Sequence, residues 1–353
     1  MFRNVKIWQK LVLAGALAVI PVLMLAALFL QSRNEQITRT QTELDGLDYV
    51  APMRQLLERL PQHRSAASAY LNGAESVGPM MMSIQSQVDG AVSVLTEIEQ
   101  KKGNALGTLQ SWESIRLRWQ DLKQRVSSLS ADESNRRHTQ LLADVLSHLR
   151  TVGDKTGLSA EPDLEAFYLS DSILNQIPWT TEYLGQLATY GSGVAARRTM
   201  TAQEEAQIRF LVRQVSSSIE VMDRNFQSAF RYNSDLRKGL EGGVSKAISS
   251  AGFLRNLTQR EILDNAAITV LPRTYLENGP AAVTQLFNLH DQATAEIRTH
   301  LQSRIERLVE QKWTQLGWAL GLLLLSGVLV FVIQKGIAEQ IRSMSETFRQ
   351  VSK

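Results

Sequence analysis

The chain has 353 residues, 44% of them hydrophobic, no cysteine, and a formal net charge of +3 at pH 7. The lack of cysteine excludes disulfide bonds and thiol chemistry. The small net charge gives no sign of nucleic-acid binding, so no nucleic-acid partner is expected.

The first apolar segment, residues 11–30, contains no charged side chain. It is long enough to cross a bilayer as a helix, and longer than the apolar part of a usual signal peptide. We therefore interpret it as an uncleaved transmembrane helix. Arg3, Lys6 and Lys10 precede it with no acidic residue among them, so the positive-inside rule predicts that residues 1–10 are cytoplasmic.

The long region that follows, residues 31–312, is predicted to be periplasmic and almost wholly helical. Apolar residues recur there every three or four positions, without the alternation that is typical of strands. The expected helices, in chain order, cover residues 11–72, 78–102, 105–128, 130–153, 163–190 and 201–230, with a last helix from 280 that continues through a second apolar segment.

Two helix starts carry the capping-box pattern, in which a hydroxyl residue is followed three positions later by glutamate. The pairs are Ser130 with Glu133 and Thr201 with Glu204. Each pair satisfies backbone N–H groups that the first turn of a helix leaves without partners. We expect a helix to begin directly after Ser130 and after Thr201.

Other residues predict breaks. Residues 191–193 and 278–280 contain glycine and proline and are expected to form turns, and Pro178 is expected to kink its helix. Residues 31–312 are too many for one four-helix bundle of modest length. The prediction is an all-α fold with two four-helix bundles stacked end to end, favoured over one very long bundle.

The second transmembrane helix is predicted at residues 313–335. Within it, Leu316 to Ile333 contains only Ser326 as a polar side chain and would extend roughly 27 Å at 1.5 Å per residue. Trp313 lies at one end, where indole rings favour the headgroup level. These features predict a multi-pass protein of a bacterial inner membrane, with the lipid bilayer as a partner.

The final stretch, residues 336–353, has apolar residues at alternating spacings of four and three. This a/d pattern is typical of a coiled coil and predicts a cytoplasmic helix that pairs with a second copy, making the protein a homodimer. The positions expected to relay a signal are Ile337, Ile341, Met344, Phe348 and Val351.

Motifs of the familiar enzyme classes are missing from the sequence. There is no GxxxxGK phosphate loop and no GxSxG nucleophile elbow. No two of the five histidines are three or four residues apart, which is the spacing that a metal pair on one helix face would need. We expect no enzyme activity, no metal site and no cofactor.

Short motifs are scattered over two blocks and a third element. The first block contains Glu43, Gly46, Tyr49, Pro52, Leu56, Leu57, Gln62-His63-Arg64 and Gly73. The second contains Glu161-Pro162-Asp163-Leu164, Phe167-Tyr168-Leu169, Asp171, Pro178, Leu184-Gly185 and Gly191. The third element consists of Leu271-Pro272 and Tyr275.

Together these motifs resemble the bimodular helical periplasmic sensor module of bacterial methyl-accepting chemotaxis receptors and related sensor histidine kinases. Residues 337–353 resemble the first helix of a HAMP relay. Two positions depart from the pattern. Ser65 stands where the module often has glycine, and Gln340 stands where the relay usually has proline.

The resemblance implies a transmembrane chemoreceptor-type signal input. It would sense a periplasmic small-molecule ligand, with small anions as candidates, and relay a helix shift to a cytoplasmic output beyond Lys353, such as a chemotaxis kinase complex. Two alternatives stay open. One is the sensor region of a histidine kinase or of a cyclic-di-nucleotide enzyme. The other is a membrane-anchored helical scaffold that binds a periplasmic protein.

Arg59, His63 and Arg64 are the first candidates for ligand binding. Arg59 and His63 are four residues apart and share a helix face. Charged side chains inside a bundle are costly unless they are paired. A buried basic group here would therefore need either an anionic ligand or an internal carboxylate, and a solvated face with Glu58 as a local partner is the alternative.

Four further residues complete the predicted site. Tyr168 and Asp171 could contribute the internal partner, or could pack and cap their own helix. Trp179 and Tyr183 are four residues apart beside Pro178, so they could form the aromatic wall of a pocket. Aromatic side chains at helical spacing also occur in ordinary helix cores.

Overall fold

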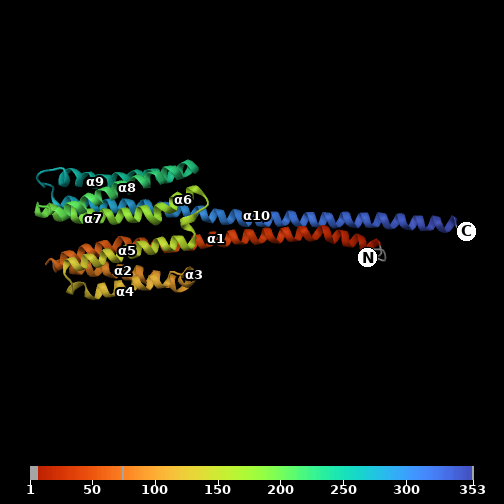
Figure 1. Cartoon of the computed structure of the whole chain (residues 1–353), viewed down its shortest axis with the longest axis horizontal. Coiled ribbons are helices and arrows are strands. Elements are labelled where there is room, and N and C mark those ends of the chain that lie inside the picture. Colours follow the sequence, from red (N-terminus) through yellow and green to blue (C-terminus); the bar gives the residue numbers. More distant parts are fainter. Residues whose placement is uncertain (1–6, 74, 352–353) are drawn as a thin grey trace. The chain divides into compact units, whose positions relative to one another are not determined.

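The structure is a computed structural model that describes residues 7–73 and 75–351, and every regular element among them is a helix (Figure 1). The all-α prediction is confirmed. The chain divides into two compact units, one formed by Thr42–Gln302 and the other by Met1–Gln41 with Ser303–Lys353.

Four helices of the larger unit form a first bundle, which buries Trp112 and Trp119 almost completely. These helices are the last thirty residues of α1 (Ile7–Leu71), then α2 (Gly78–Ile98), α4 (Leu109–Arg125) and α5 (Ala131–Thr156). The connecting elements are the 3₁₀ turns Glu75–Val77, Val126–Ser128 and Leu158–Ala160, the π-helical turn Glu99–Gly103, and α3 (Asn104–Leu106).

The second bundle follows in the chain and buries Phe226 and Phe287. Its elements are α6 (Leu164–Asp171), the π-helical turn Ser172–Gln176, α7 (Ile177–Arg197), α8 (Ala202–Tyr232), α9 (Asp235–Thr258), the π-helical turn Gln259–Leu263, and the first part of α10 (Pro272–Val351). The kink expected at Pro178 is replaced by a π-helical turn directly before it. This turn changes the direction of the chain where proline lacks an N–H group.

The two bundles lie side by side within the unit Thr42–Gln302 (Figure 1). Arg54 on α1 pairs with Asp291 on α10 at 3.1 Å, and Asp48 pairs with Arg298 at 3.3 Å. A third pair, Arg64 on α1 with Glu182 on α7 at 2.8 Å, joins the bundles about three turns further along α1. The prediction of end-to-end stacking is therefore wrong, because the helices of both bundles cover the same stretch of the unit.

Both predicted turns lie inside helices. Gly191 is within α7, and a Cβ atom there would lie 2.4 Å from the ring of Tyr275. Gly279 is within α10, and its Cβ would lie 2.5 Å from the Cβ of Ala188. Each glycine thus allows α7 and α10 to approach closely. The turn prediction failed because glycine can serve close packing as well as a turn.

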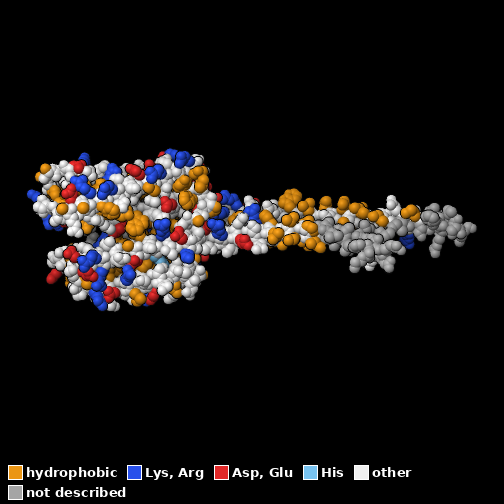
Figure 2. Space-filling view, in the orientation of Figure 1, with side chains coloured by type: hydrophobic (Ala, Val, Ile, Leu, Met, Phe, Trp, Pro, Cys, Tyr) orange, Lys and Arg blue, Asp and Glu red, His pale blue; other side chains and the backbone are white. Residues whose placement is uncertain are grey.

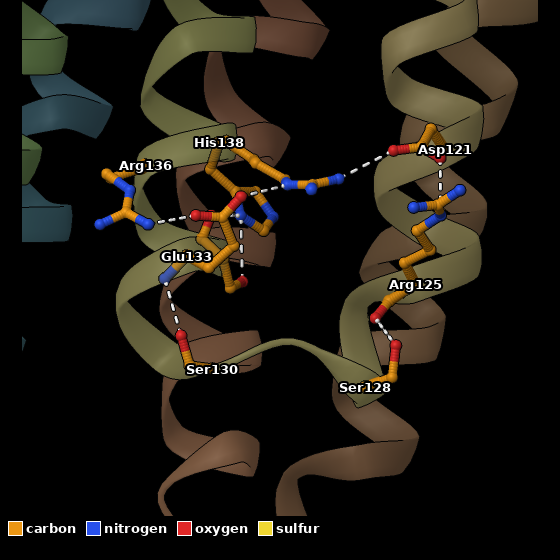
Figure 3. A network of polar contacts seen from close by, with 9 residues as sticks. Asp121, Arg125, Ser128, Ser130, Glu133, Arg136 and His138 are labelled. Carbon is orange, nitrogen blue, oxygen red and sulfur yellow. Dashed lines mark hydrogen bonds and ion pairs between the residues drawn. The ribbon is translucent and has the colours of Figure 1, made fainter.

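Both helices begin where predicted, and the full capping box forms at Thr201 but only its first half at Ser130. The Thr201 side chain accepts from the Glu204 N–H and the Glu204 side chain accepts from the Thr201 N–H, which completes a capping box at the start of α8. At the start of α5, Ser130 accepts a hydrogen bond from the Glu133 N–H at 3.2 Å, while the Glu133 carboxylate binds Arg136 (Figure 3). Local sequence is enough to specify these contacts.

In the smaller unit, α10 is the one helix among the described residues whose length and composition suit a membrane crossing. Its most apolar eighteen-residue window has a mean hydropathy of 2.5, and Figure 2 shows hydrophobic side chains along its surface. The prediction of two flanking transmembrane helices is therefore supported at residues 313–335 and not at residues 11–30. The side chains of residues 10–18 lie outside those that the structure describes.

The predicted relay positions all lie on α10, which continues to Val351. Ile337 is half-buried and Met344 is exposed. The side chains of Ile341, Phe348 and Val351 lie outside those that the structure describes. The coiled-coil pairing of this stretch stays a prediction.

We expect Gly191→Ala to destabilise the protein by about 1–3 kcal/mol, because the added methyl group overlaps the Tyr275 ring. Gly90→Ala is the matched control, since nothing lies within 4 Å of a Cβ atom at that position, and it should stabilise α2 by up to about 1 kcal/mol. Thermal unfolding followed by circular dichroism measures both changes. Equal melting temperatures for the two variants would contradict the close contact between α7 and α10.

Candidate functional site

One buried ion pair links the two bundles. The Arg64 guanidinium on α1 donates to both carboxylate oxygens of Glu182 on α7, with N–O distances of 2.8 and 3.2 Å. It also donates to the Thr139 hydroxyl on α5 at 3.0 Å, and Gln186 donates to Glu182 at 2.7 Å. We call Arg64, Thr139, Glu182 and Gln186 the central polar contact.

The central polar contact is almost sealed from solvent. The side chains of Arg64 and Glu182 are 7% and 5% exposed. A buried pair of this kind adds little net stability when complete, because both charges lose their hydration. Removing one partner leaves the other charge buried and uncompensated, which costs several kcal/mol. The contact therefore favours the packing of the two bundles in which both charges meet.

Beside this contact, a pair of buried histidines joins α1 to α5. His63 Nδ1 lies 2.8 Å from His138 Nε2, and His138 Nδ1 lies 2.7 Å from the carbonyl oxygen of Ser134. His138 Nδ1 must donate to that carbonyl, so its Nε2 accepts a hydrogen bond from His63 Nδ1. Both rings are then neutral. Burial agrees with this, because it lowers the pKa of His63 to about 4 and that of His138 to about 3.

A second polar cluster lies inside the first bundle, around the fully buried Glu99. The Glu99 carboxylate contacts His148 Nε2 at 3.0 Å and accepts from the Thr108 hydroxyl at 2.9 Å. A Cβ atom at Gly103 would lie 2.0 Å from a Glu99 oxygen, so only glycine leaves room for the carboxylate. Ser111 Oγ lies 2.9 Å from His148 Nδ1. This order resembles a hydrolase triad, but Ser111 also donates to the Thr108 carbonyl at 2.7 Å, so we assign the cluster a structural role.

The third polar cluster surrounds Asp171 at the π-helical turn that ends α6. Its carboxylate accepts from the side-chain amides of Asn175 at 2.9 Å, Gln176 at 3.1 Å and Asn225 on α8 at 2.7 Å. Asp171 therefore ties α6 to α8 within the second bundle. It is not the partner of Arg64.

The predicted site residues fall into separate groups. Arg59 binds Gln62 at 2.9 Å and lies 3.6 Å from Glu58, which is the local pairing considered as the alternative. Trp179 and Tyr183 stack with ring centroids 5.8 Å apart. Trp179 is partly exposed, and burial raises the pKa of the Tyr183 hydroxyl.

Arg64 itself was a predicted site residue. Of the other predicted residues, only Tyr183 is adjacent in sequence to Glu182, the carboxylate that binds Arg64. Sequence reasoning required a carboxylate for a buried basic group but did not identify Glu182, nor Thr139 and His138 on α5. No local signal marks these partners, since they lie 75 to 118 positions away from their contacts on α1. Within residues 7–73 and 75–351, no group of three or more His, Cys, Asp or Glu side chains could hold a metal ion.

Comparisons with known proteins give one informative likeness. No protein-family model matches the chain, and no curated protein matches it. The fold is similar to a solved structure, that of the NasR transcription antiterminator, with a TM-score of 0.60 and 15% sequence identity. The likeness covers 87% of this chain and 84% of that one, and at this identity it shows a shared fold.

This finding overturns the resemblance to the chemotaxis and sensor-kinase module and the chemoreceptor-type function derived from it. The same finding corrects the predicted partners, namely a chemotaxis kinase complex and no nucleic acid, because the solved structure with this fold is that of a transcription antiterminator. The scattered motifs have a physical explanation in packing. Gly46 lies against Thr156, and Gly191 lies against Tyr275. Close packing of the helices therefore requires glycine at these two positions, whatever the protein does.

We expect Arg64→Met to destabilise the protein by about 3–5 kcal/mol, because Glu182 is left buried without a counter-charge. Glu182→Met should cost a similar amount. The double variant should be more stable than either single variant, since no charge is then buried. Chemical denaturation of all four proteins measures the coupling, and strictly additive effects would show that the two side chains do not interact.

The histidine pair predicts acid sensitivity. Both pKa values are lower in the folded chain than the usual 6.5, so the unfolded state binds more protons between pH 6.5 and about 4. Stability should therefore fall as the pH drops below 6.5, by up to about 1.4 kcal/mol per pH unit for each group. Denaturation between pH 7 and 5 tests this. His138→Gln should flatten the slope, because it removes one of the two buried imidazoles.

Proposed function

We propose that this chain is a regulatory protein of transcription and that its helical unit, Thr42–Gln302, is a regulatory domain that contacts nucleic acid. The observation that carries the proposal is the fold shared with a transcription antiterminator over 87% of this chain and 84% of the other. A likeness that extends over most of both chains supports a common architecture for the whole protein rather than for one short motif.

The proposal does not include catalysis. The sequence lacks a phosphate loop and a nucleophile elbow. The buried polar groups described above hold helices together: Arg64 with Glu182 joins the two bundles, Asp171 with Asn225 joins α6 to α8, and Glu99 fastens a π-helical turn. A protein of this kind acts by favouring one packing or one partner over another.

We also propose that residues 316–333 of α10 attach the protein to a membrane. Their apolar composition supports this, as does the exposure of Trp318 and Leu324, which are 72% and 73% exposed. By the positive-inside rule, the charges that flank residues 316–333 do not favour one side of the membrane for the helical unit. Arg304, Arg307 and Lys312 on one flank are balanced by Lys335 and Arg342 on the other.

Nucleic-acid binding is tested directly on the full chain in nanodiscs of uncharged lipid. Fluorescence anisotropy with a labelled 30-nucleotide structured RNA should show saturable binding at 50 mM salt. The affinity should fall as salt rises, because neutralised phosphates release their counterions. Double-stranded DNA of the same length is the comparison ligand. Absence of binding to either nucleic acid at 50 mM salt would overturn the proposed function.

A second test determines on which side of the membrane the helical unit lies. Because the chain contains no native cysteine, an introduced cysteine is the only thiol that can be labelled. Contact with nucleic acid requires the helical unit to face the cytoplasm. A cysteine introduced as Ser245→Cys, at an exposed position on α9, should resist an impermeant maleimide in intact cells and react after lysis. Met344→Cys, on the other side of the membrane, should already react in intact cells. Labelling of Ser245→Cys in intact cells would place the unit outside and remove the proposal.

A further inference from the structure

An exposed aromatic surface lies where α6 meets the end of α8. The Tyr168 and Tyr232 rings stack with centroids 6.3 Å apart and planes 14° apart, and Phe167 contacts Tyr168 edge-on at 5.4 Å. Tyr232 is 55% exposed and Phe167 is 36% exposed. One face of Tyr232 is therefore covered by Tyr168, while much of the ring remains open to solvent.

Basic side chains surround this aromatic surface. Arg231 is adjacent to Tyr232 in sequence and donates to the Ser228 hydroxyl at 2.9 Å. The Arg237 guanidinium lies 5.2 Å above the Phe230 ring centroid. Lys238 pairs with Asp235 and Arg237 pairs with Glu241, so the exposed basic side chains that remain on this part of α8 are Arg224 and Arg231. Figure 2 shows blue and orange side chains side by side where α8 and α9 meet.

The acidic side chains of α6 are Glu165 and Asp171, and within the described part of the chain neither forms a hydrogen bond or ion pair with Arg224 or Arg231. Asp171 is surrounded by three amide donors, from Asn175, Gln176 and Asn225. Glu165, on the first turn of α6, is half-buried. Among the described residues, Arg224 and Arg231 take part in no ion pair, and the side-chain contact of Arg231 is a hydrogen bond to the neutral Ser228 hydroxyl, so both arginines can bind an anion without first breaking an ion pair.

We infer that this surface, formed by Phe167, Tyr168, Arg224, Arg231 and Tyr232, binds single-stranded RNA. A base stacks on the open face of Tyr232, and the arginines contact the neighbouring phosphates. Aromatic rings beside arginines are the combination that single-stranded nucleic acids use, because every base offers a π face and every linkage a negative charge. This inference rests on the proposed function and assigns it a location.

The test uses the full chain in nanodiscs of uncharged lipid, with labelled twelve-nucleotide oligo(U) and oligo(A) RNA. Tyr232→Ala should weaken binding by about 5- to 150-fold, which is the effect expected from removing one stacked base. Tyr232→Phe keeps the ring and should bind like the parent chain. Tyr190→Ala, at an exposed aromatic position on α7, should also leave the affinity unchanged. Melting temperatures of all variants establish that they fold.

The arginines are tested through salt dependence. Arg224→Gln and Arg231→Gln should each lower the slope of log affinity against log salt by about 1, because each variant neutralises one phosphate fewer than the parent chain does. If the parent chain binds RNA and Tyr232→Ala binds equally well, the surface is misplaced while the proposed function stands. If the parent chain binds no RNA, the inference falls, and the proposed function falls with it when double-stranded DNA is not bound either.

One further outcome also overturns the inference. The same aromatic and basic side chains suit an anionic lipid surface. With residues 316–333 of the chain held in nanodiscs of uncharged lipid, co-flotation with added vesicles of pure phosphatidylcholine or with 30% phosphatidylglycerol distinguishes the two ligands. If Tyr232→Ala no longer floats with the anionic vesicles while its RNA affinity is unchanged, the surface is assigned to lipid.

Discussion

The buried pair of Arg64 and Glu182 is the interaction on which the arrangement of the helical unit depends. Its two opposite charges, both nearly inaccessible to water, come from different bundles. Apolar contacts between bundles tolerate sliding, because many registers bury similar areas. A bidentate pair between guanidinium and carboxylate tolerates very little, because either charge alone in that position is strongly unfavourable. The pair thus selects one register among many.

The other buried polar groups act within a bundle and over shorter distances. His63 and His138 stay neutral, so they add directional contacts between α1 and α5 without adding charge. Glu99 fits into the space that Gly103 leaves free. A unit built in this way has a defined interior, and its chemistry toward partners must come from the surface. The proposed contact with RNA at the α6–α8 corner is consistent with that division.

Much of the local structure could be predicted from the sequence, and most of the distant pairing could not. The hydrogen bonds that cap α5 at Ser130 and α8 at Thr201 join residues three apart, so the spacing of these residues alone was enough to predict both helix starts. The cost of burying a charge left an anionic ligand, an internal carboxylate and a solvated face open near Arg64, and nothing in the sequence identified Glu182, 118 positions away, as the partner. The turn predicted at Gly191 was wrong because close helix packing and tight turns both favour glycine. The predicted function was the least accurate result, because residues that helix packing requires can resemble the motifs that mark a protein family.

The π-helical turn Ser172–Gln176 has a consequence for how the chain tolerates length changes. Such a turn accommodates one residue more than an α-helix would, and one residue corresponds to about 100° of rotation. Deleting a single residue there would restore a regular α-helix and leave the segment after it facing nearly the same way, because the wider turn takes up the extra residue. Glu182 would then still face Arg64, whereas the same deletion between Ile177 and Glu182 would rotate Glu182 by about 100°. The π-helical turn is therefore the place before Glu182 where the chain tolerates the loss of one residue.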